Sequence, residues 1–359
     1  MSFYSIKDAY DLALLLQYHD ANCRHDLSEG FVTSERDYVS NLATHLRYPA
    51  GSLQNSHIPP SAGMPVPIFD GEVKSFTLPP SYEQALGFDG IIILELTNES
   101  RSEVQHKVGF FEAKWPRMFG GHQHLYPTKT GNRDAWDSIP TVTVKNSHPE
   151  SHFSNQLTRQ HDLASEVLVL WEQFFSEEAV GTSTLAEFKR TGSTCVFHEE
   201  AYQYMSSVPK LNPRNISQKN ACWKRADPTK LLKKKPTHTL ASIIFGMAIC
   251  KYGKPIVGSP GSLTIPVSTA VADKVFGQLS NGIVINLPTE DPSSNGAVLR
   301  TMRKYGLTNY TYVTLSEAGI ARAAEEERLE FVKERKAKID RLLASFELEE
   351  TSQLPIDTL

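Results

Sequence analysis

Two apolar segments joined by a short polar run constrain the fold more than any other part of the sequence. The first is GFDGIIILEL at residues 87–96, and the second is KVGFFEAKWP at residues 107–116. Both are rich in residues that favour strands, and the polar residues 97–106 between them can turn the chain. We therefore predict an antiparallel hairpin.

Three charged side chains fall at one end of this hairpin. Asp89 opens the first strand, and Glu112 and Lys114 lie near the end of the second. Side chains alternate across a strand, so Glu112 and Lys114 share a face while Ala113 points away. Two carboxylates this close repel each other and are costly to desolvate unless a divalent cation lies between them. The pattern indicates a metal-dependent hydrolytic site.

The Glu-x-Lys spacing alone carries little information, because it occurs at residues 72–74, 112–114, 187–189 and 334–336. Residues 334–336 fall in a predicted helix, where positions two apart do not share a face. Residues 72–74 lie in a proline-rich stretch, and residues 187–189 have no apolar strand around them. Only residues 112–114 follow a strand that opens with an aspartate. A structural salt bridge at a sheet edge remains the alternative.

Two amphipathic helices precede the hairpin, at residues 4–18 and 33–46. Ser34 with Asp37 resembles a capping box, which would place Glu35 in the first helical turn. A carboxylate in a first turn is also favoured by the helix dipole on a solvated face, so a purely local role for Glu35 stays open.

Residues 47–80 contain seven prolines and little periodicity, and we predict a long loop there. After the hairpin we predict a helix at residues 151–175 and a strand at residues 193–198. This order favours an α/β domain over residues 1–208, with a mixed sheet flanked by helices.

The arrangement resembles the PD-(D/E)XK nuclease superfamily, the fold of many restriction endonucleases, over about residues 30 to 200. The resemblance implies that Asp89 and Glu112 bind the metal, that the backbone carbonyl of Ala113 adds an oxygen ligand, and that Lys114 orients or activates water. Glu35 matches the further acidic residue, and possible metal ligand, on the preceding helix.

Gln156 matches a glutamine on the crossover helix of recombination-type exonucleases in this superfamily, and we include it among the catalytic candidates. Those enzymes carry a tyrosine where this chain has Gln160. The family motif places a proline directly before its aspartate, whereas Phe88 precedes Asp89 here. The implied cofactor is Mg²⁺, with Mn²⁺ as an alternative. Phosphodiester hydrolysis needs a hydroxide near neutral pH and a counter-charge for the phosphate, and a divalent cation supplies both.

A basic segment follows this domain, and we predict a linker at residues 209–236. Its residues 223–236 hold six basic side chains against one acidic one. A solvated linker and a strap that contacts phosphates are both compatible with this composition. The nucleic-acid contacts expected here are Lys224, Arg225, Lys233, Lys234 and Lys235.

Residues 237–325 predict a separate, smaller α+β domain. Its order of helix, turn, strand, basic loop, strand and helix resembles a winged helix, a DNA-binding fold, with the first helix at residues 267–279 and the strands at residues 283–287 and 310–315. The basic loop would add Arg300, Arg303 and Lys304 to the nucleic-acid contacts.

A long C-terminal helix and tail is predicted over residues 326–359. Side chains at alternating steps of three and four between positions 329 and 346 form a short heptad seam, which is apolar except for Lys336. The seam could pack on its own domain or form a homodimer.

Whole-chain properties narrow the function classes. A chain of 359 residues predicts two or three domains, and a net charge of −4 requires any polyanion-binding surface to be local. No signal peptide or membrane span is recognisable, and four scattered cysteines suit reduced thiols, so we expect a cytoplasmic location and no membrane partner.

Together these features predict a Mg²⁺-dependent DNA endonuclease of restriction or phage-defence type, which could work with protein partners of a defence system. One alternative is a DNA-binding regulator or assembly subunit with an inactive nuclease fold. The other is a ribonuclease.

Overall fold

The computed structural model of the chain describes residues 3–32, 35–47, 69, 71–77, 86–98, 103–114, 117–119, 122–124, 152–175, 188, 192–208, 228–258, 262–267, 283–288, 300, 302–316, 336–337, 339–341 and 343–344. The statements below concern these residues. None of the helices within them is long and apolar enough to cross a membrane.

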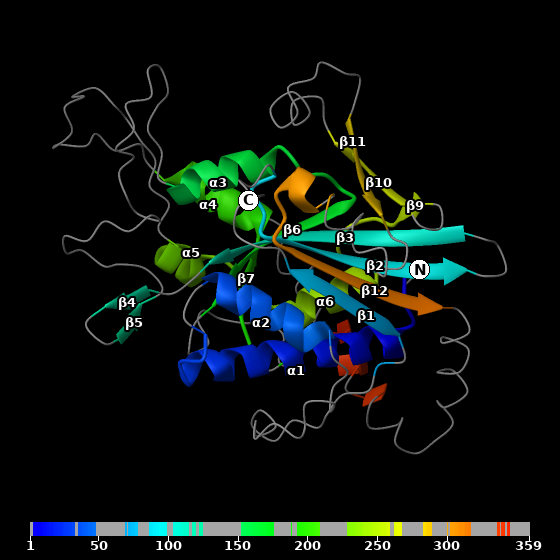
Figure 1. Cartoon of the computed structure of the whole chain (residues 1–359), viewed down its shortest axis with the longest axis horizontal. Helices are drawn as coiled ribbons and strands as arrows, with labels where there is room; N and C mark the ends of the chain where they lie inside the picture. The colour runs from blue at the N-terminus through cyan, green and yellow to red at the C-terminus, as the bar shows by residue number, and fades with distance from the viewer. Residues whose placement is uncertain are drawn as a thin grey trace, which may run out of the picture.

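An eight-stranded mixed sheet forms the centre of the molecule, with the order β1-β12-β2-β3-β6-β7-β8 and β9 also paired to β3 (Figure 1). The pairs β12/β2 and β3/β6 are parallel, and the other pairs are antiparallel. The strands are β1 (Glu72–Thr77), β2 (Gly90–Asn98), β3 (Glu103–Lys114), β6 (Leu168–Phe174), β7 (Thr194–Phe197), β8 (His238–Thr239), β9 (Ile256–Gly258) and β12 (Asn309–Ser316).

Helices cover both faces of this sheet. One face packs against α1 (Ile6–Ser28), α2 (Glu35–Arg47) and α6 (Leu240–Ala248), and the other carries α3 (His152–His161) and α4 (His198–Ser207) (Figure 1). The short helix α5 (Pro228–Lys234) contributes to the core under α3 and α4. Two small hairpins lie outside the main sheet, formed by β4 (Arg117–Phe119) with β5 (His122–His124) and by β10 (Ser262–Val267) with β11 (Ile283–Pro288).

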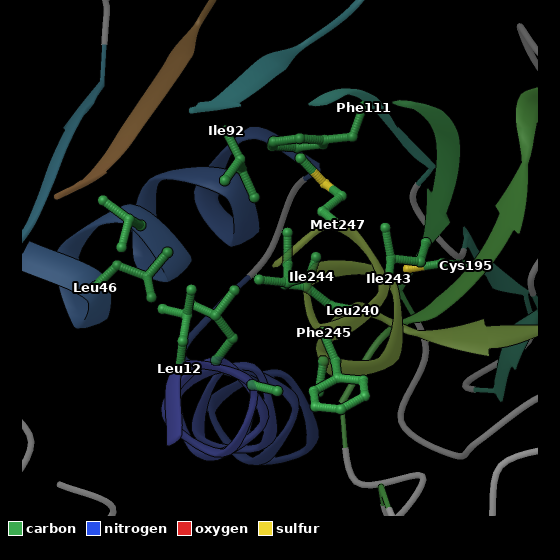
Figure 2. Packing of buried hydrophobic residues seen from close by; sticks show 14 of the residues in the cluster. Leu12, Leu46, Ile92, Phe111, Cys195, Leu240, Ile243, Ile244, Phe245 and Met247 are labelled. Carbon is green, nitrogen blue, oxygen red and sulfur yellow. The ribbon is translucent and has the colours of Figure 1, made fainter. Parts of the chain in front are cut away.

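Strand alternation sorts the core into these two layers. Ile92 of β2 and Phe111 of β3 face the helices α1, α2 and α6, where Met247 of α6 lies against Phe111 (Figure 2). Their neighbours Ile91 and Phe110 belong to the core on the opposite face. The predicted fold class, a mixed α/β sheet flanked by helices, is therefore confirmed.

The hairpin and the two N-terminal helices are also confirmed, although α1 extends to Ser28, beyond the predicted end at residue 18. β2 and β3 pair antiparallel with Gly90 opposite Phe111. The helix α2 begins at Glu35, which places this residue in its first turn. Ser34, the expected cap, lies outside the described residues.

The helix predicted over residues 151–175 is wrong in its second half. The helix α3 ends at His161, and residues 168–174 form strand β6, which runs parallel to β3. All seven residues of β6 are buried. A strand covered on both faces shows no polar alternation, so its sequence also suits a buried helix.

The loop predicted over residues 47–80 is interrupted by β1, an edge strand that pairs with β12. Its burial is mixed, with a single buried residue, and prolines precede and follow it in the sequence. The mixed burial and the flanking prolines both make this strand difficult to recognise from the sequence, because edge strands are only partly covered.

The separate domain predicted over residues 237–325 is not observed. Strand β12 lies inside the main sheet between β1 and β2, and α6 packs on α1. The strand β11 pairs with β10 and not with β12, so the two strands expected in one wing have different partners. The helix expected at residues 267–279 lies outside the described residues from position 268 onward.

Three positions of the predicted C-terminal seam lie within the described residues, and one of them, Lys336, is exposed. Ile339 is buried in the same core as α1 and α2, and Leu343 packs against that core. At these two positions the seam packs on its own chain, and the homodimer contact stays a prediction.

Candidate active site

Three strand termini meet at one end of the sheet. Strand β2 begins there, and β3 and β6 end there, with Lys114 opposite Phe174. This arrangement brings together the residues that the sequence pattern singled out: Asp89 is 7%, Glu112 2% and Lys114 0% exposed. The predicted residues therefore form a compact, buried group.

The backbone and side chain of Asp89 are both held in place. Its carboxylate Oδ2 accepts a hydrogen bond of 2.7 Å from the N–H of Ala113, and its own N–H donates to the carbonyl of Phe111 at 2.9 Å. Its carbonyl accepts from the N–H groups of Thr308 and Asn309, each at 2.9 Å, and from Thr308 Oγ1 at 2.8 Å. Strand β3 thus holds the carboxylate of Asp89, and the start of β12 holds its backbone carbonyl.

The carbonyl of Ala113 is directed toward the same side. Within a strand, alternate residues direct their backbone groups to the same neighbouring strand. The carbonyl of Phe111 and the N–H of Ala113 both bond to Asp89. The remaining carbonyl of Ala113 therefore lies on the edge of β3 that carries Asp89, which is where the predicted oxygen ligand would be needed.

Lys114 shares hydrogen bonds with Glu112 and with Gln156 of α3. Its Nζ lies 2.8 Å from Glu112 Oε1 and 3.0 Å from Gln156 Oε1, and Gln156 Nε2 donates to Glu112 Oε1 at 2.5 Å. One turn later on α3, Gln160 Nε2 donates to the carbonyl of Gly87, near Asp89, at 2.6 Å. The glutamine pair therefore fixes both sides of the site.

Glu172 is a fourth buried charge that the sequence analysis missed. It lies opposite Glu112 in the parallel pairing of β3 and β6, is 0% exposed, and places Oε2 3.9 Å from Lys114 Nζ. Its Oε1 lies 3.3 Å from Nδ1 of His198, the first residue of α4. If residues 168–174 had been predicted as a strand, Glu172 would have been noticed, because it is the only acidic residue of that apolar segment.

Burial and mutual charge shift the pKa values of this group. Burial raises the pKa of Glu112 well above its usual value, the carboxylates of Asp89 and Glu172 raise it further, and Lys114 acts in the opposite direction. Burial acts to lower the pKa of Lys114, but the surrounding carboxylates, Glu112 foremost, raise it above its usual value. The lysine is therefore held as an ammonium.

Glu35 reaches the margin of the site through α2. Tyr38, one helical turn later, stacks on Phe175 with 3.7 Å between ring centroids, and the N–H of Phe175 donates to the carbonyl of Lys114 at 2.9 Å. Glu35 is partly exposed, and its charge is among those that raise the pKa of Lys114.

The chemistry of these residues fits a divalent cation such as Mg²⁺. Within the described parts of the chain, no group of three or more His, Cys, Asp or Glu side chains is placed to hold a metal by itself. Mg²⁺ in nucleotide and phosphate sites, however, takes one or two carboxylates and completes its shell with water and substrate oxygens. Asp89 and Glu112 supply two carboxylates.

Two further observations support this fit. The buried Oε2 of Glu112 has no hydrogen-bond partner among the described residues, so an acceptor is left for a cation. Asp89, Glu112 and Glu172 oppose one buried ammonium, Lys114. Besides burial, the carboxylates of Asp89 and Glu172 raise the pKa of Glu112, and a cation bound between the carboxylates would relieve this repulsion.

Arg303 and Lys304 are exposed on a short helical turn just before β12. Met302 and Tyr305 of the same turn are buried, and Leu307 N–H donates to the carbonyl of Met302 at 2.9 Å. The chain then continues directly into Thr308 and Asn309, the residues that hold Asp89. Arg300 is exposed at the start of this segment.

Part of the basic segment at residues 223–236 also lies near the site. Lys233 and Lys234 are exposed at the end of α5, whose Leu231 and Leu232 belong to the core that contains Phe174. Lys235 Nζ instead forms an ion pair with Glu200 at 2.6 Å. Lys224 and Arg225 lie outside the described residues.

Comparison of the chain with protein-family models, with curated proteins and with solved structures found no match. The geometry and chemistry of the site are therefore the basis for assigning a function.

Proposed function

We propose that the protein is a metal-dependent nuclease of the PD-(D/E)XK type that cleaves DNA endonucleolytically. The observation that carries the proposal is the buried group of Asp89, Glu112 and Lys114 at the meeting point of β2 and β3. The function of restriction or phage defence is part of the same proposal.

The order of elements around this group supports the proposed restriction-endonuclease-like core. Helix α2 is followed by β1, by the hairpin β2/β3, by the crossover helix α3 and by β6, which is parallel to β3. One departure from a simple core is β12, which comes from the C-terminal third of the chain and lies between β1 and β2.

In this proposal, Asp89 and Glu112 hold Mg²⁺, with the carbonyl of Ala113 as a further oxygen ligand. Bound there, the cation would lower the pKa of a water molecule and stabilise the charge on the phosphate. Lys114 acts as a hydrogen-bond donor to a phosphate oxygen through its ammonium, which lies 2.8 Å from Glu112 Oε1. Gln156 keeps that ammonium in place.

The exposed cations near the site support a polyanionic substrate. Arg303 and Lys304 adjoin the segment that holds Asp89, and Lys233 and Lys234 project from α5 near Phe174. Cations around a cleavage site bind the phosphate backbone without regard to base sequence. They suit a nucleic acid better than a small phosphorylated metabolite, because they are spread over two separate segments.

The direct test is cleavage of supercoiled and linear DNA by the purified full chain with Mg²⁺, Mn²⁺ or EDTA. We expect cleavage that requires the metal and is lost in Glu112→Gln and in Lys114→Met. Both substitutions keep the side-chain size, and circular dichroism should show that both variants fold. Single-stranded DNA and RNA serve as alternative substrates.

Glu95→Gln is the matched control. Glu95 is also a buried carboxylate on this hairpin, but it bonds to His106 at 2.9 Å toward the opposite end of the strands. This variant should cleave DNA like the wild type. Metal-independent cleavage, or undiminished cleavage by Glu112→Gln, would remove the proposal, and DNA binding without any cleavage would favour a regulator with an inactive fold.

A further inference from the structure

We propose that Glu172, held by His198, is a positioning residue that orients the ammonium of Lys114 when Glu112 is engaged by the metal. The inference rests on the proposed nuclease function. It concerns two residues, on β6 and α4, that lie outside the Asp89–Glu112–Lys114 pattern.

The geometry places Glu172 where it can share the ammonium of Lys114. The carboxylate lies on the same face of the sheet as Glu112, one strand away, because the two residues are direct partners in the parallel β3/β6 pairing. Lys114 Nζ is 2.8 Å from Glu112 Oε1 and 3.9 Å from Glu172 Oε2. Both glutamates and the lysine are at most 2% exposed, so solvent screens these charges very little.

Glu112 has two roles in the proposed function, and these roles compete. Its Oε1 is the closest anion to Lys114, and the same carboxylate is expected to bind Mg²⁺. A carboxylate that donates electron density to a dication attracts a neighbouring ammonium less strongly. A buried ammonium that loses its nearest anion is no longer held in one position. Glu172 supplies a second anion that is not needed for the metal.

His198 fixes the second anion. Its Nδ1 lies 3.3 Å from Glu172 Oε1, and the residue is 1% exposed. Because α4 begins directly after β7, and β7 pairs with β6, the backbone holds the imidazole beside Glu172. The other oxygen, Oε2, has no hydrogen-bond partner among the described residues and is the atom that approaches Lys114. The pair thus leaves one carboxylate oxygen available to the ammonium.

The pair Glu95–His106 shows what a purely structural carboxylate looks like in this fold. Glu95 accepts hydrogen bonds from Thr97 at 3.1 Å and from Tyr312, in addition to its 2.9 Å contact with His106. Both of its oxygens are therefore satisfied by neutral donors or histidine. Glu172 has fewer such partners and faces a catalytic cation instead.

The test measures single-turnover cleavage at saturating DNA, together with DNA affinity measured in Ca²⁺, for Glu172→Gln and Glu172→Asp. We expect Glu172→Gln to lower the cleavage rate at least tenfold with an unchanged Kd for DNA. Glu172→Asp keeps the charge and should recover part of the rate. Glu95→Gln, with a comparable buried Glu–His pair, should leave the rate unchanged even if its thermal stability falls.

Two further variants separate positioning from packing. In His198→Asn the amide can replace Nδ1 as a donor to Glu172, whereas His198→Leu removes the donor, so we expect a clear rate loss only in the leucine variant. A wild-type rate in Glu172→Gln would overturn this inference alone, whereas a wild-type protein that does not cleave would overturn the proposed function and this inference with it.

Discussion

The carboxylate of Asp89 and the backbone N–H of Ala113 are joined by a hydrogen bond of 2.7 Å, which locks the start of β2 to the end of β3. The contact gives Asp89 a structural role in addition to its proposed metal-binding role. Two substitutions at this position can separate the two roles.

We expect Asp89→Asn to keep the fold and to lose metal-dependent cleavage, because the amide oxygen can still accept from Ala113 but carries no charge. Asp89→Ala should also lose about 1–3 kcal/mol of unfolding free energy, since a buried N–H is then left without its acceptor. Urea unfolding and DNA cleavage measure the two effects. Equal stability of both variants would contradict the structural role.

The exposed cations Arg303 and Lys304 should contribute to DNA affinity but not to sequence preference. We expect the double variant Arg303→Gln, Lys304→Gln to bind DNA more weakly and to lower the slope of log K against log salt by about 1 to 2. The control is Lys254→Gln, because Lys254 pairs with Glu166 beside the start of β6, at the other end of that strand. Titrations of labelled duplex at several salt concentrations measure the slope, and an equal slope in all three proteins would exclude Arg303 and Lys304 as phosphate contacts.

The stability of the fold should fall on the acid side because of His19. This residue is 3% exposed, and burial, together with the nearby His45, lowers its pKa from 6.5 to about 3. The folded state therefore prefers the neutral ring. The contribution of His19 to the free energy of unfolding is therefore fully present above pH 6.5 and is lost as the pH falls toward 3. At pH 5 the free energy of unfolding is lower by roughly 2 kcal/mol.

Urea unfolding of the wild type and of His19→Gln at pH 7.5 and pH 5 checks this expectation. The wild type should lose more unfolding free energy between the two pH values than the variant, which cannot titrate at position 19. The same loss in both proteins would show that another group is responsible.

Gly109 tests the pairing of β3 with β6, the part of the fold that the sequence did not predict. A Cβ at this position would lie 2.5 Å from Cζ3 of Trp171. We expect Gly109→Ala to lose about 1–3 kcal/mol of stability through overpacking. Trp171→Phe in the same chain removes the clashing ring atoms and should restore part of the loss. If Gly109→Ala is as stable as the wild type, the two strands do not pack as described.

The hairpin was predictable because its signals are local. Apolar residues on both strands, a polar turn and charged residues at one end define β2, β3, Asp89, Glu112 and Lys114 without any long-range information. The structure brings these three charged residues together as expected.

The two strands that were predicted wrongly, β6 and β12, share a physical cause. Strand pairing between distant segments of the chain leaves no local signal in the sequence. Strand β6 is buried on both faces and therefore has the sequence of an apolar helix, and Glu172 was overlooked with it. Strand β12 was recognised as a strand, but nothing in residues 309–316 indicates that they pair with residues 90–97. Pattern analysis consequently assigned β12 to a second domain.

The position of β12 also determines when the site can exist during synthesis. Strand β12 lies between β1 and β2, and Thr308 and Asn309 hold the carbonyl of Asp89. A ribosome makes Asp89, Glu112 and Lys114 long before it makes residues 308–316. The backbone of Asp89 therefore lacks its contacts with Thr308 and Asn309 until β12, the last of the described sheet strands, has been made. The nascent chain therefore carries these three residues before the group that they form is assembled, and the proposed nuclease would gain its activity only after the sheet is complete.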